Sequence, residues 1–290
     1  KGFKAFVRVI KGDALKTAFP LIHTVGRASI SAPRLIELTW GNKSSPAITI
    51  IGKGVCFDTG GLNLKTSLSM NLMKKDMGGG GIAVALASYI MSRGLKIFLR
   101  LLVPVVENSI SSVSFRPGDI LKSRSGKTIE INNTDAEGRL ILADAITYAN
   151  EKDPFLIICM ATLTGAARVA LGAELVPFYC TNDKIAEGLE EMSKLYGDPI
   201  WRMPFYEPYR KHIKSKIADL DNAPSGGMAG SITAALFLKE FINDLTNFVH
   251  FDLYAWSLNS TSAWQLGAKA QTLATLAGLL ENISERMDIS

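Results

Sequence analysis

Four acidic residues in this 290-residue sequence lie in short glycine-containing segments next to apolar runs. They are Asp58 within 52–65, Asp76 within 73–81, and Asp135 and Glu137 within 132–139. Carboxylate oxygens are the ligands that hard divalent cations prefer, and four carboxylates are enough to bridge two ions. Two such ions can hold a shared hydroxide and polarise a carbonyl group. The set therefore indicates metal-assisted hydrolysis at neutral pH.

Two cationic residues lie in the same segments. Lys65 ends the first segment and Arg139 ends the third. Hydrolysis of an acyl group develops negative charge on the carbonyl oxygen, and a fixed positive group stabilises that charge. Lys65 and Arg139 are both candidates for this role. From the residues alone, Lys53 is interpreted as a contact for an anion.

Each segment also has an ordinary structural explanation. Asp58 could lie on a surface turn after a strand. The Gly-Lys-Gly tripeptide at 52–54 could belong to a phosphate loop, but it lacks the GxxxxGK[ST] spacing. Asp76 could belong to a helix-terminating turn. In the third segment, Thr134 or Asp135 could cap a helix, although a cap explains only one acid of the octapeptide.

The elements that must position these residues alternate along the chain. Short apolar runs rich in β-branched residues predict strands at 47–52, 55–57, 96–106, 155–160 and 249–254. Helical spacing predicts helices at 81–92, 137–150, 231–241 and 270–280. This alternation predicts an α/β fold with a mixed, largely parallel sheet sandwiched between helices. Ligands bind at the carboxyl edge of such a sheet, where the three acidic segments are expected.

Composition narrows the class of protein. The net charge of +5 invites a nucleic-acid hypothesis, but the only dense basic run, 209–216, is typical of a solvated surface. Three widely spaced cysteines indicate a reducing compartment, and Cys56 and Cys159 are expected to be buried in apolar runs. Three scattered histidines cannot build an HExxH-type zinc site. No apolar run reaches 18 residues, so no membrane span is expected.

The same segments resemble the leucyl aminopeptidase (cytosol aminopeptidase) family. NTDAEGRL at 133–140 is that family's signature octapeptide, and segments 52–65 and 73–79 match as well. Further matches are RPGD at 116–119, ATLTGA at 161–166 and ITAALFLKE at 232–240. The resemblance runs from about residue 25 to 280. It implies that residues 1–290 are a single metallopeptidase catalytic domain, without the family's separate N-terminal domain.

The resemblance also implies a role for each site residue. One divalent ion would be bound by Lys53, Asp58, Asp76 and Glu137, and a second by Asp58, Asp135 and Glu137. The ions would be zinc or manganese, with magnesium as a third option. Lys65 would stabilise the oxyanion, and Arg139 would hold a bicarbonate ion that acts as the general base. The implied enzyme releases N-terminal amino acids from peptides and assembles as a cytoplasmic homohexamer.

The pocket for the first side chain of the substrate is implied at Met73, Thr162, Gly165 and Tyr254. Relatives carry a small residue where this chain has Tyr254, and usually Asp where it has Cys159. A tyrosine there predicts poor activity on leucyl and phenylalanyl substrates and a preference for small or polar first residues. The alternative is that Tyr254 points into the neighbouring core. Two other functions stay open, namely a DNA-binding role in addition to catalysis and a scaffold without activity.

Overall fold

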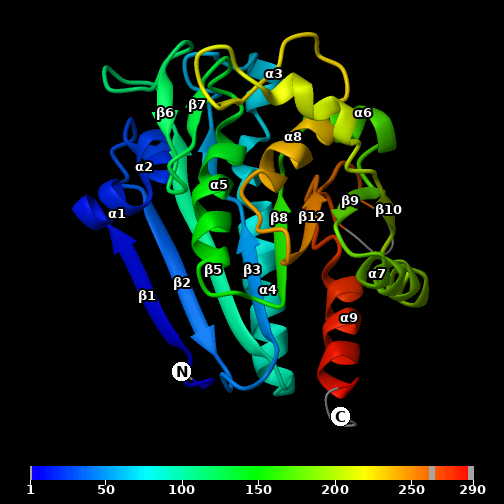
Figure 1. Ribbon diagram of the computed structural model, residues 1–290. Coiled ribbons are helices and arrows are strands. Elements are labelled where there is room, and N and C mark those ends of the chain that lie inside the picture. The colour runs from blue at the N-terminus through cyan, green and yellow to red at the C-terminus, as the bar shows by residue number, and fades with distance from the viewer. Residues whose placement is uncertain (1, 261–264, 287–290) are drawn as a thin grey trace.

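The computed structural model describes residues 2–260 and 265–286, and its central element is a nine-stranded sheet (Figure 1). Its strands follow the order β1-β2-β5-β3-β8-β12-β9-β10, and β4 pairs with β5 beyond the end of β3. The bounds are β1 Phe6–Lys11, β2 Arg34–Trp40, β3 Ala47–Gly52, β4 Gly54–Asp58, β5 Phe98–Asn108, β8 Leu156–Ala161, β9 Val176–Cys180, β10 Ile200–Arg202 and β12 Asn247–Asp252.

The sheet is mixed, with a parallel centre. Strand β3 pairs in parallel with β5 and β8, β8 pairs in parallel with β12, and β4 pairs in parallel with β5. The pairs β1–β2, β2–β5 and β12–β9 are antiparallel. The carboxyl ends of β3, β5, β8 and β12 therefore meet at one edge, the upper edge in Figure 1. Loops and short helices gather above this edge.

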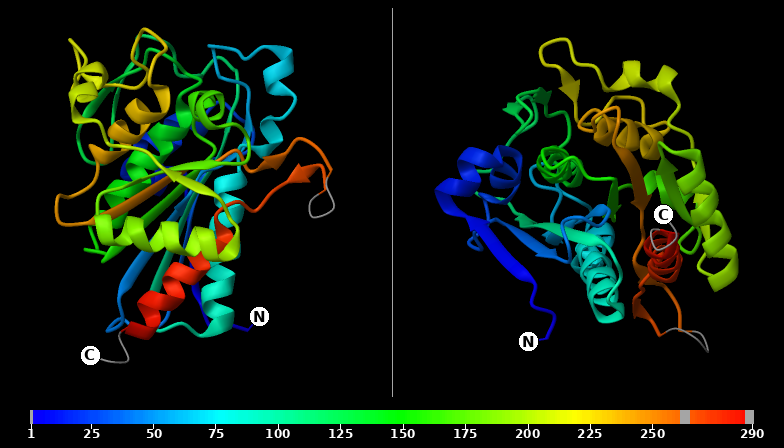
Figure 2. Two further views of the ribbon diagram at one scale, coloured as in Figure 1. Left: turned by 90° about the vertical axis from the view of Figure 1, so that its right-hand side faces the viewer. Right: turned by 60° about the horizontal axis from the view of Figure 1, so that its bottom comes forward.

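Helices cover both faces of the sheet. Figure 2 shows α4 and α9 on one face and α5 and α8 on the other. Their bounds are α1 Gly12–Ala18, α2 Pro20–Gly26, α3 Ser67–Met70, α4 Gly78–Arg93, α5 Glu137–Asn150, α6 Gly165–Leu171, α7 Asp183–Tyr196, α8 Gly230–Lys239 and α9 Leu273–Arg286. The 3₁₀ helices are η1 Met73–Lys75 and η2 Glu207–Ile213.

The period-2 alternation of the strands divides the core into two apolar layers. In β3, Ile48 and Ile50 pack in the layer that contains α4, α7 and α9, whereas Ile51 packs in the layer that contains α2, α5 and α8. Both faces of the central strands are buried, and this is why these strands are continuously apolar in sequence. The predicted fold class is confirmed.

Two small sheets lie outside the main one. The first has the order β11-β7-β6, with β6 Ile120–Lys122, β7 Thr128–Glu130 and β11 Leu220–Asp221. The second pairs β13 Trp256–Ser257 with β14 Gly267–Ala268. Among the described residues, no helix is long and apolar enough to cross a membrane.

The prediction that Cys56 is buried is wrong. The Cys56 side chain is exposed, whereas Cys159 is fully buried in β8. Strand β4 is irregular at this point, because its register with β5 shifts between Val55 and Phe57. Such a bulge turns the intervening side chain away from the face that its position in the sequence suggests. The apolar residues around Cys56 in the sequence therefore do not predict whether its side chain is buried.

Candidate metal centre and substrate cavity

A cavity of about 790 Å³ opens at the carboxyl edge of the sheet. It is lined by every predicted site residue except Glu137, namely Lys53, Asp58, Lys65, Met73, Asp76, Asp135, Arg139, Thr162, Gly165 and Tyr254. Glu137 is 1% exposed and lies just behind this lining, in contact with Lys53. Residues from four distant parts of the chain are thus gathered in one place.

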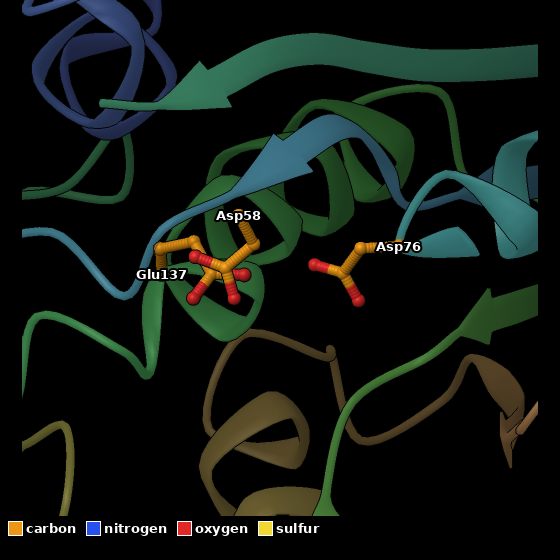
Figure 3. Close-up of side chains that lie close together, drawn as sticks. All are labelled: Asp58, Asp76 and Glu137. Carbon is orange, nitrogen blue, oxygen red and sulfur yellow. The ribbon is translucent and has the colours of Figure 1, made fainter. Parts of the chain in front are cut away.

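Three of the four predicted carboxylates converge. Asp58, Asp76 and Glu137 each offer an oxygen atom, and these three atoms lie within 4.8 Å of one another. Figure 3 shows Asp58 and Glu137 side by side, with Asp76 facing them from another segment. The fourth carboxylate, Asp135, is not part of this trio and is bound instead to Lys65.

Asp58 ends β4 and is held by the loop that follows. Its Oδ1 accepts hydrogen bonds from the backbone N–H of Gly60 at 2.9 Å and from Nδ2 of Asn108 at 2.8 Å. Gly60 has φ +88°, a conformation that favours glycine. A Cβ atom at this position would also lie 2.5 Å from the carbonyl oxygen of Asn63. Glycine at 60 therefore shapes the turn that fixes Asp58.

Asp76 precedes the glycine-rich start of α4. This end of the helix packs directly on β8, where a Cβ atom on Gly79 would lie 2.2 Å from the carbonyl oxygen of Met160. The hydroxyl of Thr162 donates to Oδ1 of Asp76 at 2.8 Å. The close approach of α4 thus brings Asp76 to the carboxyl end of β8. Asp76 caps the C-terminal end of η1, so it does lie in a helix-terminating turn, and that turn leads directly into α4.

Asp135 and Glu137 lie at the start of α5. Glu137 is the first residue of the helix, and no side chain caps it, so the capping alternative is wrong for this segment. The chain turns at Thr134 and Asp135 just before the helix begins. A Cβ atom at Gly138 would lie 2.7 Å from Cε of Lys53. Glycine at 138 therefore leaves room for the Lys53 side chain between the acids.

Two lysines link the four carboxylates. The Lys53 ammonium lies 2.7 Å from Asp76 and 2.9 Å from Glu137, and it donates to the carbonyl oxygen of Thr162 at 2.9 Å. The Lys65 ammonium lies 2.9 Å from Asp58 and 2.5 Å from Asp135. Both ammonium groups are desolvated, but the neighbouring carboxylates more than offset this and raise the pKa of each lysine.

Crowding of buried acids favours their neutral forms. Burial first, and then the Asp58 charge, raise the pKa of Glu137 to about 8, and the same two causes raise the pKa of Asp135 to about 6. Burial alone would raise the pKa of Asp58 as well, but Lys53 and Lys65 hold it below its ordinary value. The site therefore carries more acidic groups than its lysines neutralise.

The donor set fits a divalent cation. Glu137 Oε2 is buried and, within the described chain, has neither a hydrogen-bond nor an ion-pair partner. A buried carboxylate oxygen without a partner is costly unless a cation or a donor completes it. Oxygen ligands from three carboxylates at one point are the chemistry that zinc, manganese and magnesium accept.

Arg139 is 8% exposed and lies two residues after Glu137 on α5. Its Nη1 donates to the carbonyl oxygen of Asn222 at 2.6 Å, while Nε has no hydrogen-bond partner among the described residues. Burial lowers the pKa of Arg139 to about 10, so the guanidinium remains charged at neutral pH. A buried guanidinium with a free N–H suits a small planar anion.

Tyr254 lines the cavity together with Met73, Thr162 and Gly165. The Tyr254 side chain is 8% exposed and therefore forms part of the wall. Two further cations lie against its ring. Lys75 Nζ is 5.0 Å and Arg168 Cζ is 4.8 Å from the ring centroid.

Sequence reasoning did not single out Asn108, Lys75 or Arg168. Asn108 is the last residue of β5, and the carboxyl-edge rule used for the acids would have found it. Lys75 adjoins Asp76 in sequence, but no spacing indicates that its side chain turns into the cavity. Arg168 follows Gly165 by one helical turn, and only the fold shows that its side chain reaches the Tyr254 ring.

Comparison with known proteins identifies the family. Residues 2–277 match the model of the cytosol aminopeptidase family, catalytic domain. Peptidase B of Pectobacterium carotovorum is 41% identical over 281 residues, covering 94% of this chain and 64% of that protein. The crystal structure of cytosol aminopeptidase from Coxiella burnetii is 49% identical with a TM-score of 0.96, covering 97% of this chain and 62% of that one.

A further solved structure is that of the bottromycin maturation enzyme BotP in complex with Mn. It is 31% identical with a TM-score of 0.92, covering 97% of this chain and 63% of that chain. The chain thus spans less than two thirds of the length of each of these three proteins. Because the family model covers nearly the whole chain, including every residue of the cavity described above, the chain belongs to the cytosol aminopeptidase family.

Proposed function

We propose that this chain is the catalytic part of an aminopeptidase that releases N-terminal amino acids from peptides with the help of two divalent metal ions. The observation that carries the proposal is the trio of buried carboxylates Asp58, Asp76 and Glu137. One oxygen of Glu137 has no partner among the described residues. Membership of the cytosol aminopeptidase family supports the same reaction. So does the manganese present in the BotP structure.

The ligands of the ions follow the family resemblance. Lys53, Asp58, Asp76 and Glu137 would hold one ion, and Asp58, Asp135 and Glu137 the other, with zinc, manganese or magnesium as occupant. When bound, two such ions lower the pKa of a water molecule and polarise the scissile carbonyl group. As a ligand Lys53 must be neutral, and a neighbouring dication favours loss of its proton.

Two cationic residues are assigned to the reacting atoms. Lys65 donates a hydrogen bond to the oxyanion that develops as the peptide bond is attacked. A lysine ammonium is ordinarily protonated at neutral pH, as this role requires. Arg139 holds a bicarbonate ion, which serves as the general base. The unpartnered Nε of Arg139 supports this assignment.

Met73, Thr162, Gly165 and Tyr254 are proposed to line the pocket for the first side chain of the substrate. All four line the cavity that contains the carboxylates. We further propose that residues 1–290 act as one catalytic domain and that the protein works as a homohexamer in the cytoplasm. These last points rest on the family resemblance.

The reaction type can be tested with a matched pair of peptides. Manganese-loaded protein is incubated with one peptide that has a free N-terminus and with the same peptide N-acetylated, and the products are identified by mass spectrometry. The proposal predicts stepwise loss of first residues from the free peptide and no cleavage of the acetylated one. Internal cleavage of the acetylated peptide, or no cleavage of either, would contradict it.

A further inference from the structure

Two positive side chains flank Tyr254 in the cavity. Lys75, the last residue of η1, is 7% exposed, and Arg168 lies in α6. The Lys75 ammonium is 5.0 Å and the Arg168 guanidinium carbon 4.8 Å from the Tyr254 ring centroid. Within the described chain, neither cation forms an ion pair. Both line the cavity that contains the carboxylates.

The other cations of the cavity are already engaged. Lys53 and Lys65 are each bound to two carboxylates, and Arg139 donates to a backbone carbonyl oxygen. Asp76, although next to Lys75 in sequence, uses its carboxylate on Lys53 and on the Thr162 hydroxyl. The Asp76 charge attracts the Lys75 ammonium, but within the described chain no acid of the metal centre forms an ion pair with Lys75 or Arg168.

An ammonium group buried without an anion is unfavourable, and a second cation against the same ring adds repulsion. Contact with the electron-rich face of Tyr254 compensates only part of this cost. A carboxylate placed between Lys75 and Arg168 would complete both cations with charge-assisted hydrogen bonds. Lys75 and Arg168 are thus suited to bind an anionic group of a ligand that enters the cavity.

The positions of Lys75 and Arg168 indicate which part of a substrate would supply that anion. Lys75 immediately precedes Asp76, and Arg168 lies one helical turn after Gly165. Tyr254, which both cations contact, lies in the wall proposed for the first side chain of the substrate. An anionic group at this point would be the side chain of the first residue, since the peptide backbone must lie at the carboxylate trio.

We propose that this pocket selects peptides whose first residue is aspartate or glutamate, with Lys75 and Arg168 binding the side-chain carboxylate beside Tyr254. The inference rests on the proposed aminopeptidase function and adds its substrate class. It goes beyond the effect of Tyr254 on pocket volume, because it distinguishes glutamate from glutamine, which have nearly the same size. It also predicts that basic first residues are disfavoured.

The test compares glutamyl with glutaminyl amides on the manganese-loaded protein. We expect kcat/KM to favour the glutamyl substrate by about 10-fold or more, the size of one charge-assisted hydrogen bond. Lys75→Met and Arg168→Met should each reduce this ratio toward one. Lys74→Met is the matched control, because Lys74 is adjacent and exposed and lies over Trp256, outside the cavity lining. The control should keep the parental ratio.

A binding measurement separates this inference from the proposed reaction. Isothermal titration calorimetry of free glutamate and free glutamine into the manganese-loaded protein should show glutamate about 10-fold tighter. Lys75→Met should abolish this difference, and Lys74→Met should not. Because Arg168 is exposed, Arg168→Glu is expected to fold and should shift the preference toward arginyl substrates.

The outcomes are distinct. Hydrolysis of alanyl and glutaminyl amides without any preference for glutamyl amides would overturn the acidic pocket and leave the aminopeptidase intact. Preferential binding of glutamate without hydrolysis of any amide would overturn the aminopeptidase and retain the pocket. A glutamate preference that survives both Lys75→Met and Arg168→Met would also overturn the assignment of these residues.

Discussion

At the scale of single residues, Lys65 joins two acidic groups that would otherwise repel each other. Its ammonium lies between Asp58 and Asp135, and its side chain is 13% exposed, so it can reach both the acids and the cavity. If divalent ions bound the carboxylates, this ammonium would lose its two acidic partners and could face a substrate. The same residue can thus neutralise the free site and serve the reaction.

The first prediction at this scale concerns Lys65→Ala. Turnover should fall by roughly 10²–10³, the usual loss when one oxyanion-stabilising donor is removed. Steady-state rates on an aminoacyl amide measure the loss, and metal analysis of the same samples is the control, because Lys65 also contacts Asp58. Near-parental turnover in a variant with its full metal content would show that Lys65 does not have this role.

The second prediction concerns the volume of the pocket. Tyr254→Ala should raise the ratio of kcat/KM for leucyl over alanyl amides by roughly 10-fold or more, because each methylene that a pocket admits is worth about 1–3 kcal/mol. Tyr254→Phe keeps the ring and should leave the ratio unchanged. A ratio that stays constant in Tyr254→Ala would mean that Tyr254 does not limit the first side chain.

The identity of the site residues could be predicted because they lie in contiguous motifs. Asp58, Asp76 and Glu137 each lie within two residues of a glycine in a recognisable segment, and the structure brings all three together. The sequence could not predict that Asp135 would pair with Lys65. Nor could it predict Lys75 and Arg168 as neighbours, since their contact depends on how η1 and α6 pack around Tyr254.

At the scale of elements, the position of Asp76 depends on how closely α4 approaches the sheet. Gly79 lies against the backbone of Met160, and the N–H of Gly80 donates to the carbonyl oxygen of Lys53 at 2.8 Å. Gly81, in contrast, faces outward, and its Cβ would meet only the end of the Met77 side chain at 3.6 Å. Gly79 is therefore required for close packing of α4 on the sheet, whereas Gly81 is not.

This contrast gives the third prediction. Gly81→Ala should stabilise the protein by roughly 0.5–1 kcal/mol, because alanine favours the helix and finds open space. Gly79→Ala should destabilise it by roughly 1–3 kcal/mol, because its methyl group collides with a backbone carbonyl. Urea denaturation of the two variants measures both changes. The account of α4 is wrong if Gly79→Ala is as stable as Gly81→Ala.

The central strands and the helices α4, α5 and α8 were predictable because burial on most sides makes them largely apolar. The 14-residue helix α7, which has several exposed polar residues, was not predicted. Strands 47–52 and 155–160 were placed within one residue of β3 and β8. The outer strands β1 and β2 were not predicted. Most side chains of β1 are exposed, so its sequence lacks the continuous apolar signal of the centre. The short helices α1, α2 and α6 were missed because seven residues provide too few turns for a clear period.

At the scale of the molecule, the mixed sheet gathers distant segments at one edge. The acids come from the end of β4, the start of α4 and the start of α5, which are joined only because β3, β5 and β8 lie side by side. A fold of this kind tolerates changes in its loops while it keeps the metal centre. A change of residue in the cavity wall, such as at Tyr254, can therefore alter specificity without moving the carboxylates.

The central claim is that the carboxylates gathered around Glu137 bind the metal ions on which peptide hydrolysis depends. Its most direct test measures release of the first residue from an alanyl amide before and after complete removal of metal, with the metal content determined in the same samples. We predict that metal-free protein is inactive and that added Mn²⁺ or Zn²⁺ restores the rate in parallel with bound metal. Full activity in protein shown to be free of metal would contradict the claim.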